Sequence, residues 1–204
     1  MIYQTEDKGV NKHSEKPEKA KKGIYDEQPY TLSEEALLEK KVREKYRALT
    51  LKLIEEEKSI TTMESCTAGL IASLITDTEG ASAILKGACV TYSNEAKIMA
   101  GVPEEVIRDY SVYSTETAAA MAEAAKKTFR ADLAVGITGT TGNVDPENAA
   151  FSTPGVIFFS IADQSGTENF RLDLPGTGSR FLYKLRAADA VCDALMSTCL
   201  SPDF

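Results

Sequence analysis

The chain has 204 residues, with 31 acidic against 23 basic side chains and a formal net charge of −8. This length suits one domain of ordinary size. The negative charge argues against a nucleic-acid partner, because binding to a phosphate backbone needs a basic face. The sequence also lacks an apolar run of about 18 residues, which a membrane span would need. We therefore expect a cytoplasmic protein that acts on a small molecule, without nucleic acid or membrane.

Residues 1–30 are polar, carry both charge signs and show no periodicity, which predicts a disordered tail. The folded domain is predicted over residues 31–204. The single histidine, His13, lies in the tail and cannot serve a core site. A serine enzyme built on this chain would therefore need a lysine, tyrosine or carboxylate as its base.

The folded part begins with a predicted long helix, for which Thr31 and Glu34 form a capping box. The other predicted elements, in chain order, are a strand over 59–63, a helix over 67–76, a strand over 87–92, a short helix from Ser93 to Gly101, a turn whose first helical position is Pro103, a helix over 114–129, a strand over 132–137, two strands over 156–162 and 169–174 that form a hairpin, and a last helix over 178–197. Helices that alternate with strands predict a three-layer α/β fold, with a mixed, mostly parallel sheet of about five strands.

The four cysteines, Cys66, Cys89, Cys192 and Cys199, form no CxxC pair and have no histidine at metal-ligand spacing. We therefore expect no structural zinc site. Cys89 and Cys192 are interpreted as small apolar residues. Cys66 adjoins a predicted helix start, where a thiol can have a lowered pKa, so a redox or nucleophilic role stays open for it.

Three junctions between a strand and a helix are unusually polar. They are Glu64-Ser65-Cys66-Thr67, Tyr92-Ser93-Asn94-Glu95-Ala96-Lys97 and Thr138-Gly139-Thr140-Thr141-Gly142. Ligands of α/β sheets bind where strand ends meet helix N-termini, so three junctions at one edge would form one site. Each also has an ordinary alternative: a helix cap for Ser65 or Thr67, a packed ring for Tyr92, a solvated Lys97, and a tight turn for the third segment.

Together the junctions supply the groups that acyl transfer needs. Ser65 would be the nucleophile, Lys97 the general base and Tyr92 a proton relay or positioning group. Lys97 can act as a base only if its pKa falls well below about 10.4. Helix N-termini would supply positive potential and N–H groups for an oxyanion. Arg180, just ahead of the last helix, is a candidate clamp for a phosphate or carboxylate.

These motifs resemble the C-terminal domain family of the competence/damage-inducible protein CinA, the nicotinamide mononucleotide amidohydrolases. The similar stretches are Glu64-Ser65-Cys66-Thr67-Ala68-Gly69, Val90-Thr91-Tyr92-Ser93-Asn94-Glu95-Ala96-Lys97, Ala134-Val135-Gly136-Ile137-Thr138-Gly139 and, more loosely, Gly178-Ser179-Arg180 with Arg186. The resemblance covers residues 40 to 198, in the same order and with similar spacing.

The resemblance implies a three-layer α/β/α sandwich, commonly a dimer, that hydrolyses the carboxamide of nicotinamide mononucleotide to nicotinate mononucleotide and ammonia without a metal or cofactor. Ser65 would correspond to the nucleophile, and Lys97 and Tyr92 to its partners. Thr138 and Arg180 would correspond to substrate contacts. The substrate-binding residues expected within or beside these motifs are Glu64, Thr67, Gly69, Asn94, Thr138, Gly139 and Arg180.

The chain departs from the family pattern at two places. Ala68-Gly69 stands where the family has Gly-Gly, and the segment Thr140–Pro154 carries Asp145 and Glu147 in place of neutral residues. Negative charge near a phosphate site would weaken nucleotide binding. Three hypotheses therefore stay open: an amidohydrolase of a pyridine mononucleotide, a catalytically silent binding or regulatory module, and an amidase of another small carboxamide.

Overall fold

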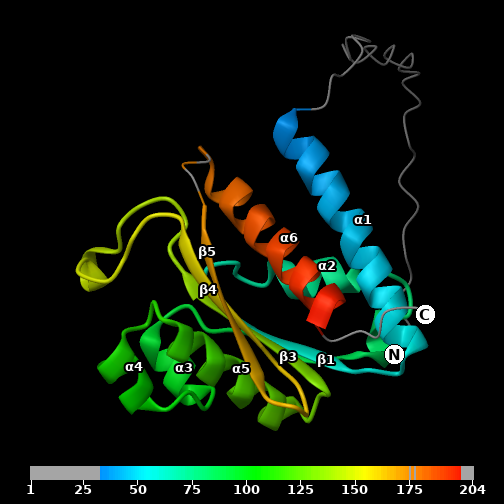
Figure 1. Ribbon diagram of the computed structural model, residues 1–204, viewed down its shortest axis with the longest axis horizontal. Coiled ribbons are helices and arrows are strands. Elements are labelled where there is room, and N and C mark those ends of the chain that lie inside the picture. Colours follow the sequence, from blue (N-terminus) through cyan, green and yellow to red (C-terminus); the bar gives the residue numbers. More distant parts are fainter. Residues whose placement is uncertain (1–32, 175, 177, 199–204) are drawn as a thin grey trace, which may run out of the picture. The chain divides into compact units, whose positions relative to one another are not determined.

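The computed structural model describes residues 33–174, 176 and 178–198. The predicted tail with His13, the predicted cap Thr31, and Cys199 lie outside the described residues. A five-stranded mixed sheet in the order β2-β1-β3-β4-β5 forms the centre (Figure 1). Its strands are β1 (Ile60–Glu64), β2 (Leu85–Val90), β3 (Leu133–Gly139), β4 (Val156–Ala162) and β5 (Thr167–Asp173). β4 runs antiparallel to both neighbours, and the other four strands share one direction.

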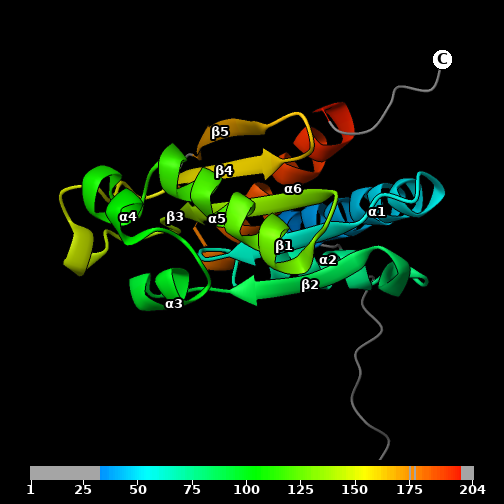
Figure 2. The same cartoon turned by 90° about the horizontal axis from the view of Figure 1, so that it is seen from below.

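Helices cover both faces of this sheet, which confirms the predicted three-layer α/β fold. They are α1 (Glu34–Glu55), α2 (Leu70–Thr76), α3 (Asn94–Met99), α4 (Glu104–Tyr110), α5 (Thr115–Phe129) and α6 (Arg180–Thr198), with short 3-10 turns η1 (Ala81–Ala83) and η2 (Pro146–Asn148). Figures 1 and 2 show α1, α2 and α6 on one face and α5 on the other. In the described ranges no helix has both the length and the apolar sequence that a bilayer crossing requires.

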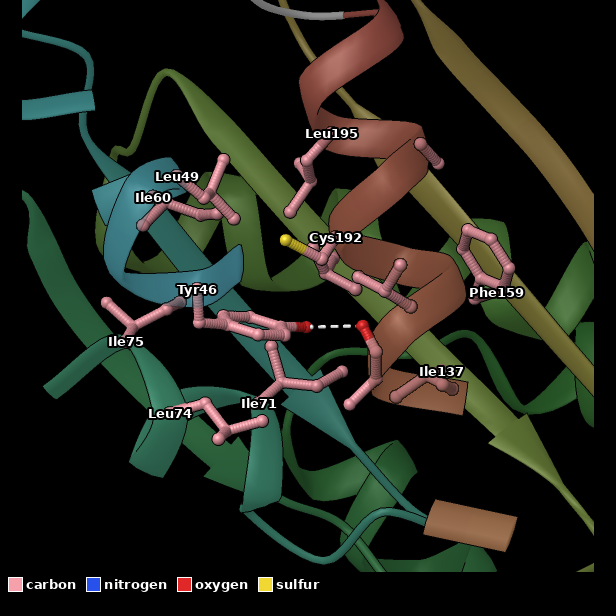
Figure 3. Packing of buried hydrophobic residues seen from close by; sticks show 14 of the residues in the cluster. Tyr46, Leu49, Ile60, Ile71, Leu74, Ile75, Ile137, Phe159, Cys192 and Leu195 are labelled. Atoms are coloured by element: carbon pink, nitrogen blue, oxygen red, sulfur yellow. Dashed lines mark hydrogen bonds between the residues drawn. The ribbon is translucent and has the colours of Figure 1, made fainter. Parts of the chain in front are cut away.

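The larger core lies between the sheet and the layer of α1, α2 and α6 (Figure 3). Tyr46 of α1 is fully buried there, and its hydroxyl donates a hydrogen bond to the carbonyl of Ala188 in α6 at 2.9 Å. All seven residues of β3 are buried, as the apolar sequence of this segment predicts. These contacts fix the central strands, whose carboxyl ends carry the polar junctions.

On the opposite face, α5 lies directly against β3. A Cβ added at Gly136 would be 2.2 Å from the carbonyl oxygen of Ala118 and 2.4 Å from the nitrogen of Ala122, so only glycine permits this approach. Ser114 caps the helix by accepting a hydrogen bond from the N–H of Thr117, as predicted. This packing sets the N-terminus of α5 beside the carboxyl edge of the sheet.

The element boundaries differ from prediction at helix starts. The N-cap of α1 is Ser33, whose hydroxyl accepts from the N–H of Ala36, in place of the predicted Thr31. Pro103 occupies the N-cap position of α4 and not its first helical position. The largest change concerns α2, which begins at Leu70 and not at Thr67.

Candidate active site

The structure brings Ser65 and Lys97 together at the carboxyl edge of the parallel strands. Ser65 follows β1, and its N–H donates to the carbonyl of Ile137 at 3.0 Å, which extends the pairing with β3. Lys97 lies in α3, which Ser93 caps as predicted. The Nζ of Lys97 lies 3.1 Å from the Oγ of Ser65, which is within the reach of a hydrogen bond.

Lys97 is fully buried and is not the solvated surface residue of the alternative interpretation. Its Nζ also donates to the carbonyl of Thr91 at 2.8 Å. Burial penalises the charged ammonium and lowers the pKa of Lys97 from 10.5 to about 8, although the nearby Cys66 and Glu95 partly oppose this. A substantial fraction of Lys97 is therefore neutral near pH 8 and able to accept a proton.

Ser65 does not cap a helix, contrary to one alternative. A turn separates it from α2, and the N-cap of α2 is Gly69, in a left-handed conformation with φ of 88°. Ala68 is also left-handed, with φ of 52°, which costs about 1 kcal/mol for a residue with a Cβ. The Ser65 hydroxyl is thus not engaged by helix N–H groups and is paired with Lys97.

Glu64 takes the capping role that the sequence assigned to Ser65 or Thr67. Its carboxylate is completely buried and accepts five hydrogen bonds from the described residues. The donors are Thr62 Oγ1 (3.1 Å), Thr67 Oγ1 (2.7 Å) and the N–H groups of Gly69 (3.0 Å), Ile71 (3.2 Å) and Ala72 (2.9 Å). The expected substrate contacts Glu64, Thr67 and Gly69 therefore hold the turn that carries Ser65.

This arrangement also changes which N–H groups could stabilise an oxyanion. The first N–H groups of α2 are occupied by Glu64 and do not face a ligand. In the described hydrogen bonds, the N–H groups of Cys66 and Thr67 have no oxygen acceptor. Both N–H groups lie near the sulfur of Cys66, where they act to lower the pKa of its thiol against the effect of burial, and a thiol is only a weak acceptor.

We predict that Glu64→Gln destabilises the domain by about 3 kcal/mol, because the buried amide would present its own N–H groups to donors that need an acceptor. Urea unfolding followed by circular dichroism measures this change. The exposed Glu79 allows Glu79→Gln as a control with the same chemical change, expected within about 0.5 kcal/mol of wild type. Equal urea midpoints for Glu64→Gln and wild type would contradict the capping role.

Tyr92, predicted as a proton relay or positioning group, lies beside the serine–lysine pair. Its side chain is 63% exposed, and its hydroxyl accepts a hydrogen bond from the Nη2 of Arg180 at 3.3 Å. Its backbone carbonyl lies 3.5 Å from the Nζ of Lys97. Among the described hydrogen bonds, none joins the Tyr92 hydroxyl to Ser65 or Lys97. The ring therefore forms a wall beside the pair, and Arg180 lies next to it.

The third junction contributes mainly to the scaffold. Thr138 is fully buried, and its hydroxyl donates to the carbonyl of Val112 at 2.9 Å. A Cβ at Gly139 would be 2.6 Å from the Cα of Ile157, so this glycine permits close packing of β3 on β4. Neither residue lines the cavity in which Ser65 and Lys97 lie.

That cavity has a volume of about 110 Å³. Its walls include Ser65, Tyr92, Asn94 and Lys97, which were predicted site residues, together with Tyr113, Asp145 and Glu147. No motif or spacing in the sequence pointed to Tyr113, which precedes the cap of α5. The acidic residues Asp145 and Glu147 were noticed only as departures from the family pattern.

Cys66 lacks the reactivity that its position beside Ser65 left open. The residue is buried, and burial, together with the charge of Glu64, raises the pKa of its thiol to about 12. A thiolate is therefore a negligible species at neutral pH. Cys66, Cys89 and Cys192 are all free thiols, as expected for residues that pack without forming disulfides.

The fold and the site define a three-layer α/β domain with a buried serine–lysine pair at the carboxyl edge of its parallel strands. The model of the CinA C-terminal domain matches residues 42–199. The chain therefore belongs to the CinA C-terminal domain family.

Relatives and solved structures support this membership. The chain is 39% identical over 127 residues to a CinA-like protein of Endomicrobium trichonymphae, covering 61% of this chain and 29% of that one. It is 34% identical over 151 residues to a putative competence-damage inducible protein of Caldicellulosiruptor saccharolyticus, covering 73% and 36%. The chain thus spans about a third of the length of these curated relatives.

A similar solved structure is that of the competence/damage inducible protein CihA from Agrobacterium tumefaciens, with a TM-score of 0.69 and 28% identity over 76% of this chain and 94% of that one. A CinA superfamily protein from Escherichia coli gives a TM-score of 0.70 and 25% identity, covering 76% and 88%. These two structures, unlike the longer relatives, are matched over most of their length.

Proposed function

We propose that this domain is a serine amidohydrolase that converts nicotinamide mononucleotide to nicotinate mononucleotide and ammonia. The observation that carries the proposal is the 3.1 Å contact between Ser65 Oγ and the buried Nζ of Lys97. A buried lysine with a lowered pKa is a suitable base for a serine where no histidine is at hand. Membership of the CinA C-terminal domain family and the resemblance of the motifs support the choice of nicotinamide mononucleotide as the substrate.

In the proposed mechanism, neutral Lys97 accepts the proton of Ser65 as the Oγ attacks the carboxamide carbon. The negative charge that develops on the carbonyl oxygen is stabilised by the N–H groups of Cys66 and Thr67. The tetrahedral intermediate then collapses, the C–N bond breaks, and the Lys97 ammonium returns its proton to the leaving nitrogen. Water, activated by Lys97, hydrolyses the acyl-serine ester and restores both side chains.

A catalytically silent binding module is the second candidate, and two observations favour it. The cavity of about 110 Å³ is smaller than most ligand pockets, which measure roughly 300–1,000 Å³. Asp145 and Glu147 also line it, where a phosphate would be repelled. This candidate requires nucleotide binding without turnover.

Steady-state ammonia release, combined with calorimetric titration, tests these functions against each other. The amidohydrolase releases ammonia from nicotinamide mononucleotide and yields nicotinate mononucleotide in equal amount. Binding of the nucleotide without ammonia would favour the silent module. Ammonia from other small carboxamides, but not from the nucleotide, would instead identify an amidase with another substrate.

A further inference from the structure

The cavity around Ser65 is acidic. Glu95, Asp145 and Glu147 all line it, from α3 and from the loop between β3 and β4. In both views this loop lies at the same end of the sheet as α3 and α4 (Figures 1 and 2). Lys97 is the single basic residue of the lining, and its Nζ is directed to Ser65 and to the carbonyl of Thr91. An anionic group inside this cavity would face three carboxylates.

Two aromatic rings, Tyr92 and Tyr113, complete the same walls. The hydroxyl of Tyr113 donates to the carboxylate of Asp145 at 2.7 Å, which holds the loop against the ring. Asn148 donates to the same carboxylate at 2.8 Å. These two hydrogen bonds lower the pKa of Asp145, so the group is an anion at neutral pH. Aromatic faces combined with fixed carboxylates are the usual means of binding an organic cation.

Arg180 lies beside one wall of this cavity, at Tyr92. It contacts the hydroxyl of Tyr92 and is not part of the cavity lining. A phosphate that reaches Arg180 would therefore lie beyond the tyrosine, outside the acidic cavity. The residues that surround Ser65 would therefore contact the ring of a bound carboxamide. The phosphate of a nucleotide substrate would be contacted only outside the cavity, near Arg180.

Building on the proposed amide hydrolysis, we propose that Asp145 and Glu147 make this site select the positive charge of a quaternary pyridinium carboxamide, with little contribution from a phosphate. The substrate class is thus a cationic N-substituted nicotinamide, either nucleoside or nucleotide. An uncharged carboxamide of the same shape is discriminated against. The two acidic residues of the β3–β4 loop are specificity-determining residues and take no part in bond breaking.

Binding to the Ser65→Ala variant tests this proposal, because it reports charge preference whether or not the wild type turns over. Calorimetric titration would compare nicotinamide mononucleotide, its nucleoside, and its dihydropyridine form, which keeps the phosphate and carboxamide but has an uncharged ring. We expect the nucleoside to bind within about threefold of the nucleotide, and the dihydropyridine about tenfold more weakly.

Variants that remove one carboxylate charge then show which residues cause the preference for the charged ring. Glu147 is exposed, and its backbone N–H donates to Asp145 Oδ1 at 3.0 Å. Its carboxylate has no hydrogen bond or ion pair within the described residues, so Glu147→Gln removes the charge without removing a contact. In the Ser65→Ala background it should reduce the preference for the charged ring about threefold, and Asp145→Asn about as much. Glu168→Gln is the matched control, since Glu168 pairs with Ile161, toward the other end of the sheet. It should leave the preference unchanged.

Equal affinities for the charged and uncharged rings would overturn the proposal, as would loss of more than tenfold affinity on removing the phosphate. Failure of all three compounds to bind would overturn it too. The proposed amide hydrolysis fails by a separate result, namely wild-type protein that binds the charged compounds but releases no ammonia. The charge preference and the amide hydrolysis are therefore tested by different measurements.

Discussion

Replacing Ser65 by alanine should lower ammonia release from nicotinamide mononucleotide by a factor on the order of 10³ or more, because no covalent intermediate can then form. Binding should change little, since the hydroxyl contacts only Lys97 among the described hydrogen bonds. Stability should also be preserved, because the turn at Ser65 is held by Glu64 and not by the serine hydroxyl.

Ser73→Ala is the matched control, because Ser73 is an exposed serine of α2. It should leave kcat, KM and the free energy of unfolding near their wild-type values. Equal rates of ammonia release in Ser65→Ala and wild type would exclude Ser65 as the nucleophile. A rise in KM with unchanged kcat would make Ser65 a binding residue only.

Replacing Lys97 by methionine should reduce kcat by a comparable factor, on the order of 10³, since the serine would lose its base. In the wild type only the neutral amine can accept the proton, and its pKa is lowered to about 8. The rate should therefore rise with pH and reach half of its plateau near pH 8. A pH-independent rate between pH 6 and 9 would exclude Lys97 as the base.

The same pKa shift predicts a pH dependence of stability. The unfolded chain holds the Lys97 proton with a pKa of 10.5, and the folded chain with a pKa of about 8. Between these values the unfolded state binds more protons, so the free energy of unfolding rises with pH across this window. Lys97→Met should lack this gain, whereas Lys127→Met, at an exposed position of α5, should keep it. The difference between the variants isolates Lys97 from other groups that titrate in the same range.

Much of the fold could be predicted because periodicity and helix caps are local signals. Ser93 and Ser114 cap helices as expected, and the apolar run of β3 is buried on both faces. The predicted start of α2 was wrong for a physical reason. The left-handed turn at Ala68 and Gly69 is stabilised by a buried carboxylate, and local propensity gives no indication of such a contact.

The site was predictable to the extent that strand ends converge. That rule placed Ser65 and Lys97 at one edge, and the structure has them within hydrogen-bond distance. It could not separate residues that face the cavity from residues that support it. Glu64 and Thr138 carry polar groups in the same motifs, yet both are satisfied within the scaffold. Tyr113 lines the cavity because of the conformation of the loop before α5, and no local sequence pattern predicts that conformation.

Because of the strand order, the segments that hold Ser65 and Lys97 differ in their resistance to local unfolding. Ser65 follows β1, which has a paired strand on each side, whereas Lys97 belongs to a helix of six residues that follows the edge strand β2. Local opening of an edge strand requires less free energy than global unfolding. Warming should therefore separate Lys97 from Ser65 while the centre of the sheet is still protected from hydrogen exchange. The lifetime of the serine–lysine contact should therefore be set by the edge strand β2 and not by the core of the sheet.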